Sequence, residues 1–256
     1  MIPLSDENPA IRPAVATWLL LAGLGAVWVV VQGAGFDERL IRSVCNLGMV
    51  PGELTRMAPI GAGVPLAEGL SCVVDREGIN ALTPVLSMFL HGGWGHLLGN
   101  ALFLWVFGNN VEDVMGSARF VVFYVLCGLA AAGLHVLVDP RSIIPTVGAS
   151  GAISGVMGAY LMLFPRARVR MLFIFGFFFR VIPLPAWGVL LWWFAIQVLA
   201  GLPQLAGVGD LTGGVAVWAH VGGFLAGVML IRAFRVPGLV AEREAMLLRR
   251  RSMGIT

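Results

Sequence analysis

The sequence contains no lysine and few charged residues of any kind. Only 12% of its 256 residues are charged, and all 17 basic residues are arginines. Soluble domains have about 25% charged residues, so this composition excludes a water-soluble enzyme. The formal net charge is only +3. Basic and aromatic residues are not interleaved, so nothing indicates a nucleic-acid partner.

Cysteine is also scarce. Cys45, Cys72 and Cys127 form neither an even disulfide framework nor a CxxC metal-binding pattern. Cys45 and Cys72 fall in one loop, and they could pair if that loop lies outside the cytoplasm. The cysteines therefore indicate little about function.

Apolar residues dominate the chain. They make up 58% of the sequence, and the mean hydropathy is +0.88. A membrane-spanning helix needs about 20 predominantly apolar residues. Six candidate segments occur, at residues 14–32, 95–109, 120–138, 148–164, 184–201 and 214–231. We expect an all-α, multi-pass integral membrane protein with a membrane domain at 14–236, an N-terminal tail at 1–13 and a C-terminal tail at 237–256.

The arginines predict the orientation of the chain, because basic residues are enriched on the cytoplasmic side. With six spans and a cytoplasmic N terminus, twelve of the 17 arginines face the cytoplasm. The others are Arg39, Arg42, Arg56, Arg76 and Arg141. We therefore expect both termini to be cytoplasmic, in the inner (plasma) membrane of a bacterium.

Two segments outside the spans have their own patterns. The loop from about residue 33 to 93 contains several prolines and short apolar patches, so we expect it to lie on the bundle or in the membrane interface. The tail after Pro237 mixes apolar and charged residues and ends in an arginine run at 249–251. This pattern is typical of a short amphipathic helix held near anionic lipid.

Polar side chains inside a span are costly in hydrocarbon and therefore indicate function. No Asp, Glu or Arg lies well inside the six apolar segments. The polar residues that remain are His96, Asn100, His135, Ser150, Ser154, Gln197 and His220. Any chemistry within the membrane must use these neutral side chains.

The fourth span is expected to be short. Pro145 blocks an early start, so the helix should begin near Gly148. The segment from there to Phe164 has about 17 residues and forms a helix about 25 Å long. The hydrocarbon core of a bilayer is about 30 Å thick, so this helix is too short to cross it. Segment 143–149 must then descend as non-helical backbone, which is tolerated only beside protein or a water-filled cavity. We expect Ser150 at the floor of that cavity, on a first helical turn whose free N–H groups favour developing negative charge.

Small residues predict close contact between the fourth and sixth spans. In the fourth span, small residues recur at every fourth position from Gly151 onward. In the sixth span, Gly223 and Gly227 have the same spacing. His220 lies three residues before Gly223 and seven before Gly227, on the same helix face. The imidazole is therefore expected beside the hydroxyl of Ser150.

Three motifs, in this order, resemble those of the rhomboid intramembrane serine proteases. They are His91-Gly-Gly-Trp-Gly-His96-Leu-Leu-Gly-Asn100, Gly148-Ala149-Ser150-Gly151, and Ala219-His220-Val221-Gly222-Gly223 with Gly227. The resemblance runs from about residue 80 to 235 and includes the turn at 110–119. It implies a six-helix bundle with a short central fourth helix below an outward-facing cavity.

The resemblance implies roles for the residues of these motifs. Ser150 would be the nucleophile, His220 the general base, and His96 and Asn100 oxyanion donors beside the Ser150 backbone N–H. The structural residues near the site would be His91, Gly148, Gly151, Gly223 and Gly227. The substrates would be single-span membrane proteins, with no metal or other cofactor.

These residue types suit the implied chemistry. A serine hydroxyl is a poor nucleophile unless a base takes its proton, and a neutral imidazole can do so near neutral pH. With no acid in the spans we expect a Ser–His dyad, in which packing must orient His220. Some rhomboids carry an aromatic residue four positions after the nucleophile that packs on the catalytic ring; here that position is Ser154.

Other classes of membrane protein fit the same residues less well. Gly207–Asp210 matches the GxGD string of intramembrane aspartyl proteases, but that chemistry needs a second Asp within a span. The HExxH pattern of zinc proteases is absent from the sequence. A catalytically silent rhomboid-like scaffold would be expected to lose Ser150 or His220. A channel or transporter with a histidine relay would be expected to have carboxylates in its spans.

Overall fold

The computed structural model describes residues 2–35, 37–67, 70–176, 178–205 and 216–253. The fold is mostly helical, and each of the six apolar segments contains a helix. These helices are α1 (Val15–Val30), α5 (Trp94–Met115), α6 (Ser117–Val138), α7 (Ser150–Leu163), α8 (Ala186–Leu205) and α9 (Val217–Phe234). The GxGD string at 207–210 and residues 214–215 of the sixth predicted span lie outside the described residues.

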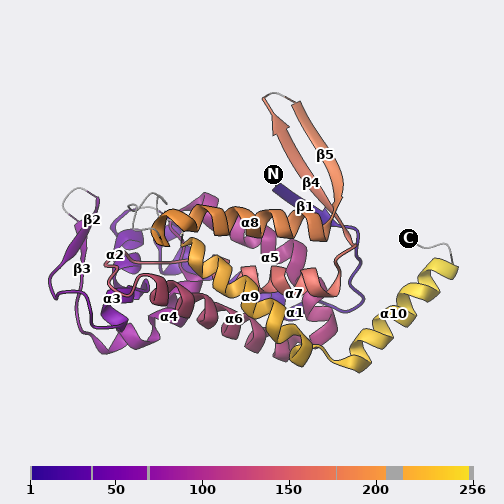
Figure 1. The fold of residues 1–256 in the computed structure, drawn as a ribbon, viewed down its shortest axis with the longest axis horizontal. Coiled ribbons are helices and arrows are strands. Elements are labelled where there is room, and N and C mark those ends of the chain that lie inside the picture. Colours follow the sequence, from indigo (N-terminus) through magenta and orange to yellow (C-terminus); the bar gives the residue numbers. More distant parts are fainter. Residues whose placement is uncertain (1, 36, 68–69, 177, 206–215, 254–256) are drawn as a thin grey trace.

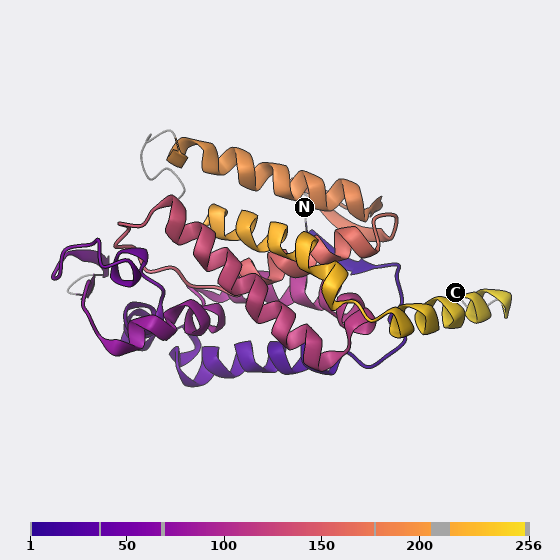
Figure 2. The same ribbon diagram turned by 60° about the horizontal axis from the view of Figure 1, so that its bottom comes forward.

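Three of these helices, α6, α8 and α9, are long and apolar enough to cross a membrane. Helices α1 and α7 are apolar but shorter. The helices run along the long axis of the molecule (Figure 1). After a 60° turn, α8 and α1 lie on opposite sides of the bundle, with α6 and α9 between them (Figure 2).

Helix α7 is the central element. Every residue from Gly151 to Tyr160 is buried. A helix that is apolar and buried on all faces must be surrounded by other elements. Its N-terminal residue, Ser150, therefore has a position fixed by the rest of the bundle.

Helices α7 and α9 touch through their backbones. A Cβ atom on Gly223 would lie 1.9 Å from the carbonyl oxygen of Gly151, and one on Gly227 would lie 1.9 Å from that of Gly155. On its other side, a Cβ on Gly151 would lie 2.6 Å from Cβ of Ala131 in α6. Only glycine allows this approach, which brings the start of α9 beside the start of α7.

The chain is not all-α, so that part of the fold expectation is wrong. Strands β1 (Ile2–Asp6), β4 (Arg168–Phe175) and β5 (Phe178–Pro185) form an antiparallel sheet in the order β1-β4-β5. The β4–β5 hairpin projects sideways from one end of the bundle (Figure 1). Strands of about eight residues produce no 20-residue apolar run, so a search for membrane spans does not reveal them.

The long loop between α1 and α5 is folded. It contains helices α2 (Asp37–Leu47), α3 (Pro51–Leu54) and α4 (Thr83–Leu86), and a hairpin of β2 (Gly63–Ala67) and β3 (Leu70–Val73). Short 3₁₀ turns at Gly33–Gly35, Gly78–Leu82 and Ser87–Phe89 complete it. A disulfide bond joins Cys45 of α2 to Cys72 of β3. These elements gather at the end of the bundle opposite α10 (Pro237–Ser252) (Figure 1).

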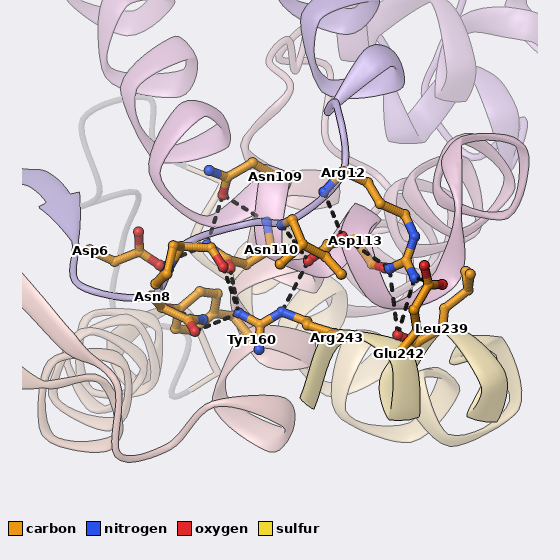
Figure 3. Close-up of polar contacts among 12 residues, drawn as sticks. Asp6, Asn8, Arg12, Asn109, Asn110, Asp113, Tyr160, Leu239, Glu242 and Arg243 are labelled. Carbon is orange, nitrogen blue, oxygen red and sulfur yellow. Dashed lines mark hydrogen bonds and ion pairs between the residues drawn. The ribbon is translucent and has the colours of Figure 1, made fainter. Parts of the chain in front are cut away.

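At the other end of the bundle, a polar network joins the N-terminal segment and α10 to α5 (Figure 3). Asp113, buried near the end of α5, pairs with Arg12 at 3.2 Å and with Arg243 of α10 at 3.0 Å. The Arg243 guanidinium also donates to Asn8 at 2.6 Å and to Asn110 at 3.1 Å. A buried charge needs such a set of partners. Helix α10 forms where the sequence predicts a C-terminal helix. One of its arginines, Arg243, is buried against the bundle.

Glu112 links three helices at this same end. It accepts hydrogen bonds from the backbone N–H groups of Ala16 and Thr17, both at 2.8 Å, in the first turn of α1. It also accepts from the hydroxyl of Ser117, the first residue of α6, at 2.6 Å. The carboxylate thereby satisfies N–H groups that have no partner within α1.

Candidate active site

Ser150 is the first residue of α7, and the backbone before it is non-helical. Met49 and Thr146 exchange two backbone hydrogen bonds of 2.9 and 2.8 Å, and the N–H of Gly148 donates to the carbonyl of Ser87 at 2.9 Å. The folded loop between α1 and α5 thus supplies partners to this segment. Such partners are needed where lipid would leave backbone groups unsatisfied.

The structure brings Ser150 and His220 together. Oγ of Ser150 lies 2.8 Å from Nε2 of His220, which is near the start of α9. The two residues are 70 positions apart in the sequence. This distance lies within the range for direct proton transfer between a hydroxyl and a base.

His220 has two further neighbours on α8. Its Nδ1 lies 2.8 Å from Oε1 of Gln197. The ring of Trp193 lies 5.8 Å from the imidazole, centroid to centroid, with 39° between the planes. The expectation that packing alone orients His220 is therefore incomplete, because Gln197 adds a hydrogen bond. A lone amide in an apolar span was the only sign of this role in the sequence.

Ser154 is directed along its own helix. Its hydroxyl donates to the carbonyl oxygen of Ser150 at 2.6 Å, one turn earlier. Serine commonly makes this bond inside helices. An aromatic residue does lie beside the His220 ring, but it is Trp193 from α8.

His96 and Asn100, one turn apart on α5, face the same space as the dyad. A Cβ on Gly148 would lie 2.7 Å from Nε2 of His96, so this ring packs directly against the backbone that precedes Ser150. Gly148 also has φ +134°, a conformation that favours glycine. Asn100 is 7% exposed, and its Nδ2 has no hydrogen-bond partner among the described residues.

His91 lies behind His96 and is buried. Its backbone N–H donates to Oε1 of Gln32 at 2.8 Å, and Nε2 of Gln32 donates to the His91 carbonyl at 2.8 Å. The His91 and His96 rings meet edge to face, 5.1 Å apart. Burial lowers the pKa of His91 to about 4, so its ring is neutral at physiological pH.

The dyad faces a cavity of about 460 Å³, a volume typical of ligand-binding pockets. Its lining includes Ser150, His220, His96, Asn100 and Trp193, together with Met49 from the loop. Within the described part of the chain, no group of three or more His, Cys, Asp or Glu side chains is arranged to hold a metal ion.

Comparison with known proteins identifies the family. The Rhomboid domain model matches residues 80–236, more than half of the chain, including all three sequence motifs. This chain belongs to the rhomboid family. The family match begins before α4 and extends through α9, so Ser150, His220, His96 and Asn100 lie inside the rhomboid domain, whereas Met49 of the cavity lining precedes it.

Several curated rhomboids are similar in sequence. Rhomboid protease GluP of Bacillus subtilis (strain 168) is 38% identical over 91 residues, which are 36% of this chain and 17% of that protein. Rhomboid-like protease 5 of Toxoplasma gondii is 32% identical over 174 residues, 63% of this chain and 18% of that protein. Rhomboid protein 1, mitochondrial, of Saccharomyces cerevisiae (strain ATCC 204508 / S288c) is 33% identical over 149 residues, 56% of this chain and 39% of that protein.

This rhomboid chain thus spans well under half the length of these relatives. Membership of the family shows that this chain is a membrane protein and that its family includes proteases. The relatives include mitochondrial and chloroplastic proteins, so membership alone does not assign a bacterial membrane.

Proposed function

We propose that this chain is an intramembrane serine endopeptidase that cleaves transmembrane segments with a Ser150–His220 dyad. The observation that carries the proposal is the 2.8 Å separation of the Ser150 hydroxyl and Nε2 of His220. The two groups line a cavity within a bundle of apolar helices. A hydroxyl paired with a base is the arrangement that activates a serine.

The dyad supports acyl transfer in two stages. Nε2 of His220 takes the Ser150 proton as Oγ bonds to the carbonyl carbon of the scissile peptide, and the carbonyl oxygen becomes negative. The C–N bond then breaks, and His220 returns the proton to the leaving amine. Water, activated by the same imidazole, hydrolyses the resulting acyl-enzyme and regenerates Ser150.

The negative oxygen needs donors that are fixed before the reaction. The Ser150 backbone N–H is at the N terminus of α7, where the helix dipole favours negative charge. His96 and Asn100 line the same cavity, and the Asn100 amide has an unpartnered buried N–H group. We assign these three groups to the oxyanion hole.

The proposed substrates are single-span membrane proteins in the surrounding lipid bilayer. An intact helix hides its carbonyl groups in its own hydrogen bonds, so a substrate must unwind locally to reach Ser150. Small residues at the cut and helix breakers just beyond it should therefore promote cleavage.

We further propose a membrane domain at residues 14–236, with six spans and an outward-facing cavity. In this arrangement both terminal tails, 1–13 and 237–256, are cytoplasmic, in a bacterial inner membrane.

A fluorophosphonate probe tests whether Ser150 is activated. The purified protein in detergent should be labelled at Ser150, Ser150→Ala should not be labelled, and His220→Ala should react far more slowly. Ser252→Ala, at an exposed serine of α10 that does not line the cavity, is the control and should retain labelling. Equal labelling of wild type and Ser150→Ala would overturn the proposal, and a wild type that is not labelled would indicate a catalytically silent scaffold.

A further inference from the structure

Helix α8 presents two side chains to the same imidazole. Trp193 and Gln197 are four residues apart, so they lie on one face of the helix. Trp193 packs on the His220 ring, and Gln197 bonds to its Nδ1 at 2.8 Å. The candidate base therefore has contacts on its ring face and at the nitrogen opposite Ser150.

The bond to Gln197 selects a tautomer. A neutral imidazole carries one N–H, and its other nitrogen accepts. Oε1 of Gln197 is an acceptor, so the proton belongs on Nδ1 of His220. Nε2 then presents its lone pair to the hydroxyl of Ser150, 2.8 Å away. This is the tautomer that a general base requires.

We infer that Gln197 is a positioning residue that holds His220 in the reactive tautomer, and that Trp193 fixes the plane of its ring. This inference rests on the proposed function of the dyad. In serine protease triads a carboxylate orients the base, and in some cysteine proteases an amide does so. An amide suits a membrane site, because it bonds to the imidazole without placing a further charge in hydrocarbon.

Cleavage kinetics test whether Gln197 acts through its acceptor oxygen. Gln197→Leu should lower kcat about 10- to 100-fold, the effect of losing one hydrogen bond to a group that becomes charged, and should change KM much less. Gln197→Glu keeps an acceptor oxygen and should recover most of the loss. Gln204→Leu, the same substitution two turns later on α8, is the matched control and should behave as wild type.

Trp193 is tested by the same assay. Trp193→Ala should lower kcat, and Trp193→Phe, which keeps an aromatic ring, should recover it. Wild-type kcat in both Gln197→Leu and Trp193→Ala would overturn the inference. Gln197→Glu as slow as Gln197→Leu would exclude positioning through an acceptor oxygen.

The tautomer of His220 can be measured in a way that does not depend on cleavage activity. In protein labelled with ¹⁵N-histidine, the His220 signals, assigned by their loss in His220→Ala, should show protonation at Nδ1. In Gln197→Leu the two tautomers should mix. Protonation at Nε2 in the wild type would refute the inference. The expected tautomer in a protein that cleaves nothing would instead refute the proposed function alone.

A second inference concerns the β4–β5 hairpin and is independent of catalysis. Its register pairs Arg170 with Pro183, Leu172 with Val181 and Ile174 with Phe179. One face therefore carries exposed arginine near the bundle and exposed apolar side chains toward the tip. At this tip, Ile174 is 52% exposed and Phe179 is 70% exposed.

The other face of the hairpin is anchored. Val169 and Met171 of β4 are buried in the hydrophobic core, so the base of the hairpin is held by the bundle. The hairpin leaves the bundle sideways, beside the start of α8 (Figure 1). Trp187, in the first turn of α8, is 52% exposed, as is typical of tryptophan at a membrane surface.

We propose that this face of the hairpin lies in the bilayer interface on the side of the two termini. Arg168 and Arg170 would meet the phosphates of anionic lipids, and Phe179 would enter the upper acyl chains. An exposed row of large apolar residues beside basic ones is the surface that binds such a leaflet.

A fluorescent depth measurement tests this placement. The NBD fluorophore is attached at Phe179→Cys or, as the control, at Glu7→Cys, in vesicles of phosphatidylethanolamine and phosphatidylglycerol. Quenching by doxyl groups high on the acyl chains should be strong at position 179 and weak at position 7. No quenching at 179 would refute the proposal. Emission that turns blue only at high protein density, without quenching by doxyl lipid, would indicate a second copy and also refute it.

Discussion

Each side chain of the proposed catalytic machinery is uncharged before the reaction. Ser150, His220 and Gln197 are joined by hydrogen bonds between neutral groups, so the site avoids the high cost of placing ions in hydrocarbon. Its reactivity then depends on how well these groups are aligned. Loss of a single hydrogen bond should therefore affect turnover strongly.

Asn100→Ala should lower kcat about 10²- to 10³-fold with a smaller effect on KM, because an oxyanion contact strengthens only as charge develops. Asn46→Ala, at an exposed position of α2, is the control and should leave both constants unchanged. Steady-state kinetics on a transmembrane substrate measure both. A raised KM with unchanged kcat would make Asn100 a binding or packing residue.

The residues of the candidate site were predictable to different degrees. Ser150 and His220 stand in local motifs, so the sequence alone indicates them. The role of Gln197 is not encoded locally. It lies 23 residues from His220 on another helix, and only the rotation of α8 turns it toward the imidazole.

Among the elements, the helices were predictable and the strands were not. A long apolar run has no stable alternative to a helix in lipid, which explains why all six segments contain one. The β4–β5 hairpin lacks such a constraint, and its pairing with β1 joins residues more than 160 positions apart. The start of α7 was expected near Gly148, and the helix begins two residues later, at Ser150, because residues 146 and 148 bond to the preceding loop instead.

The contact of α7 with α9 gives a prediction about stability. Gly227→Ala would place a Cβ 1.9 Å from the carbonyl oxygen of Gly155, so the helices must separate. Overpacking of this kind costs about 1–3 kcal/mol, and the Tm in detergent should fall. Gly25→Ala in α1, where no atom lies within 4 Å, is the control and should not lower it. Equal Tm values for the two variants would contradict the close contact.

The attachment of β1 should depend on pH. Burial raises the pKa of Asp6 from 3.8 to about 6, where it accepts hydrogen bonds from Asn110 and Tyr160 (Figure 3). The folded state thus favours the protonated carboxyl, so stability from this group is present below pH 4 and lost as pH rises to about 6. The loss is at most about 3 kcal/mol.

Asp6→Asn removes this titration. Between pH 4 and 7 the Tm of wild type should fall relative to that of Asp6→Asn, whereas Glu7→Gln, an exposed neighbour, should follow the wild type. Parallel pH profiles for wild type and Asp6→Asn would show that Asp6 titrates normally.

The two ends of the molecule are built differently. One end carries the folded loop with its disulfide, and the other carries both terminal segments, tied to α5 by Asp113. A disulfide persists in an oxidising compartment. In the orientation that the arginines predict, this loop lies outside the cytoplasm.

The disulfide gives a test of that orientation. In protein purified without reductant, Cys45 and Cys72 should resist maleimide in denaturant, whereas Cys127, a free cysteine, should react. Cys45→Ser should lower stability by about 2–4 kcal/mol. Reaction of all three cysteines with maleimide would place the loop in a reducing compartment.

We propose above that Ser150 and His220 cut a peptide bond within a membrane. The most direct measurement is cleavage of a single-span substrate by the purified protein in proteoliposomes, with the cut mapped by mass spectrometry. Wild type should cut near the end of the span that lies on the side of the long loop, and should prefer a span with Gly or Pro over an uninterrupted leucine span. Ser150→Ala and His220→Ala should not cut. Equal cleavage by all three proteins, or cuts confined to the end beside the two termini, would contradict it.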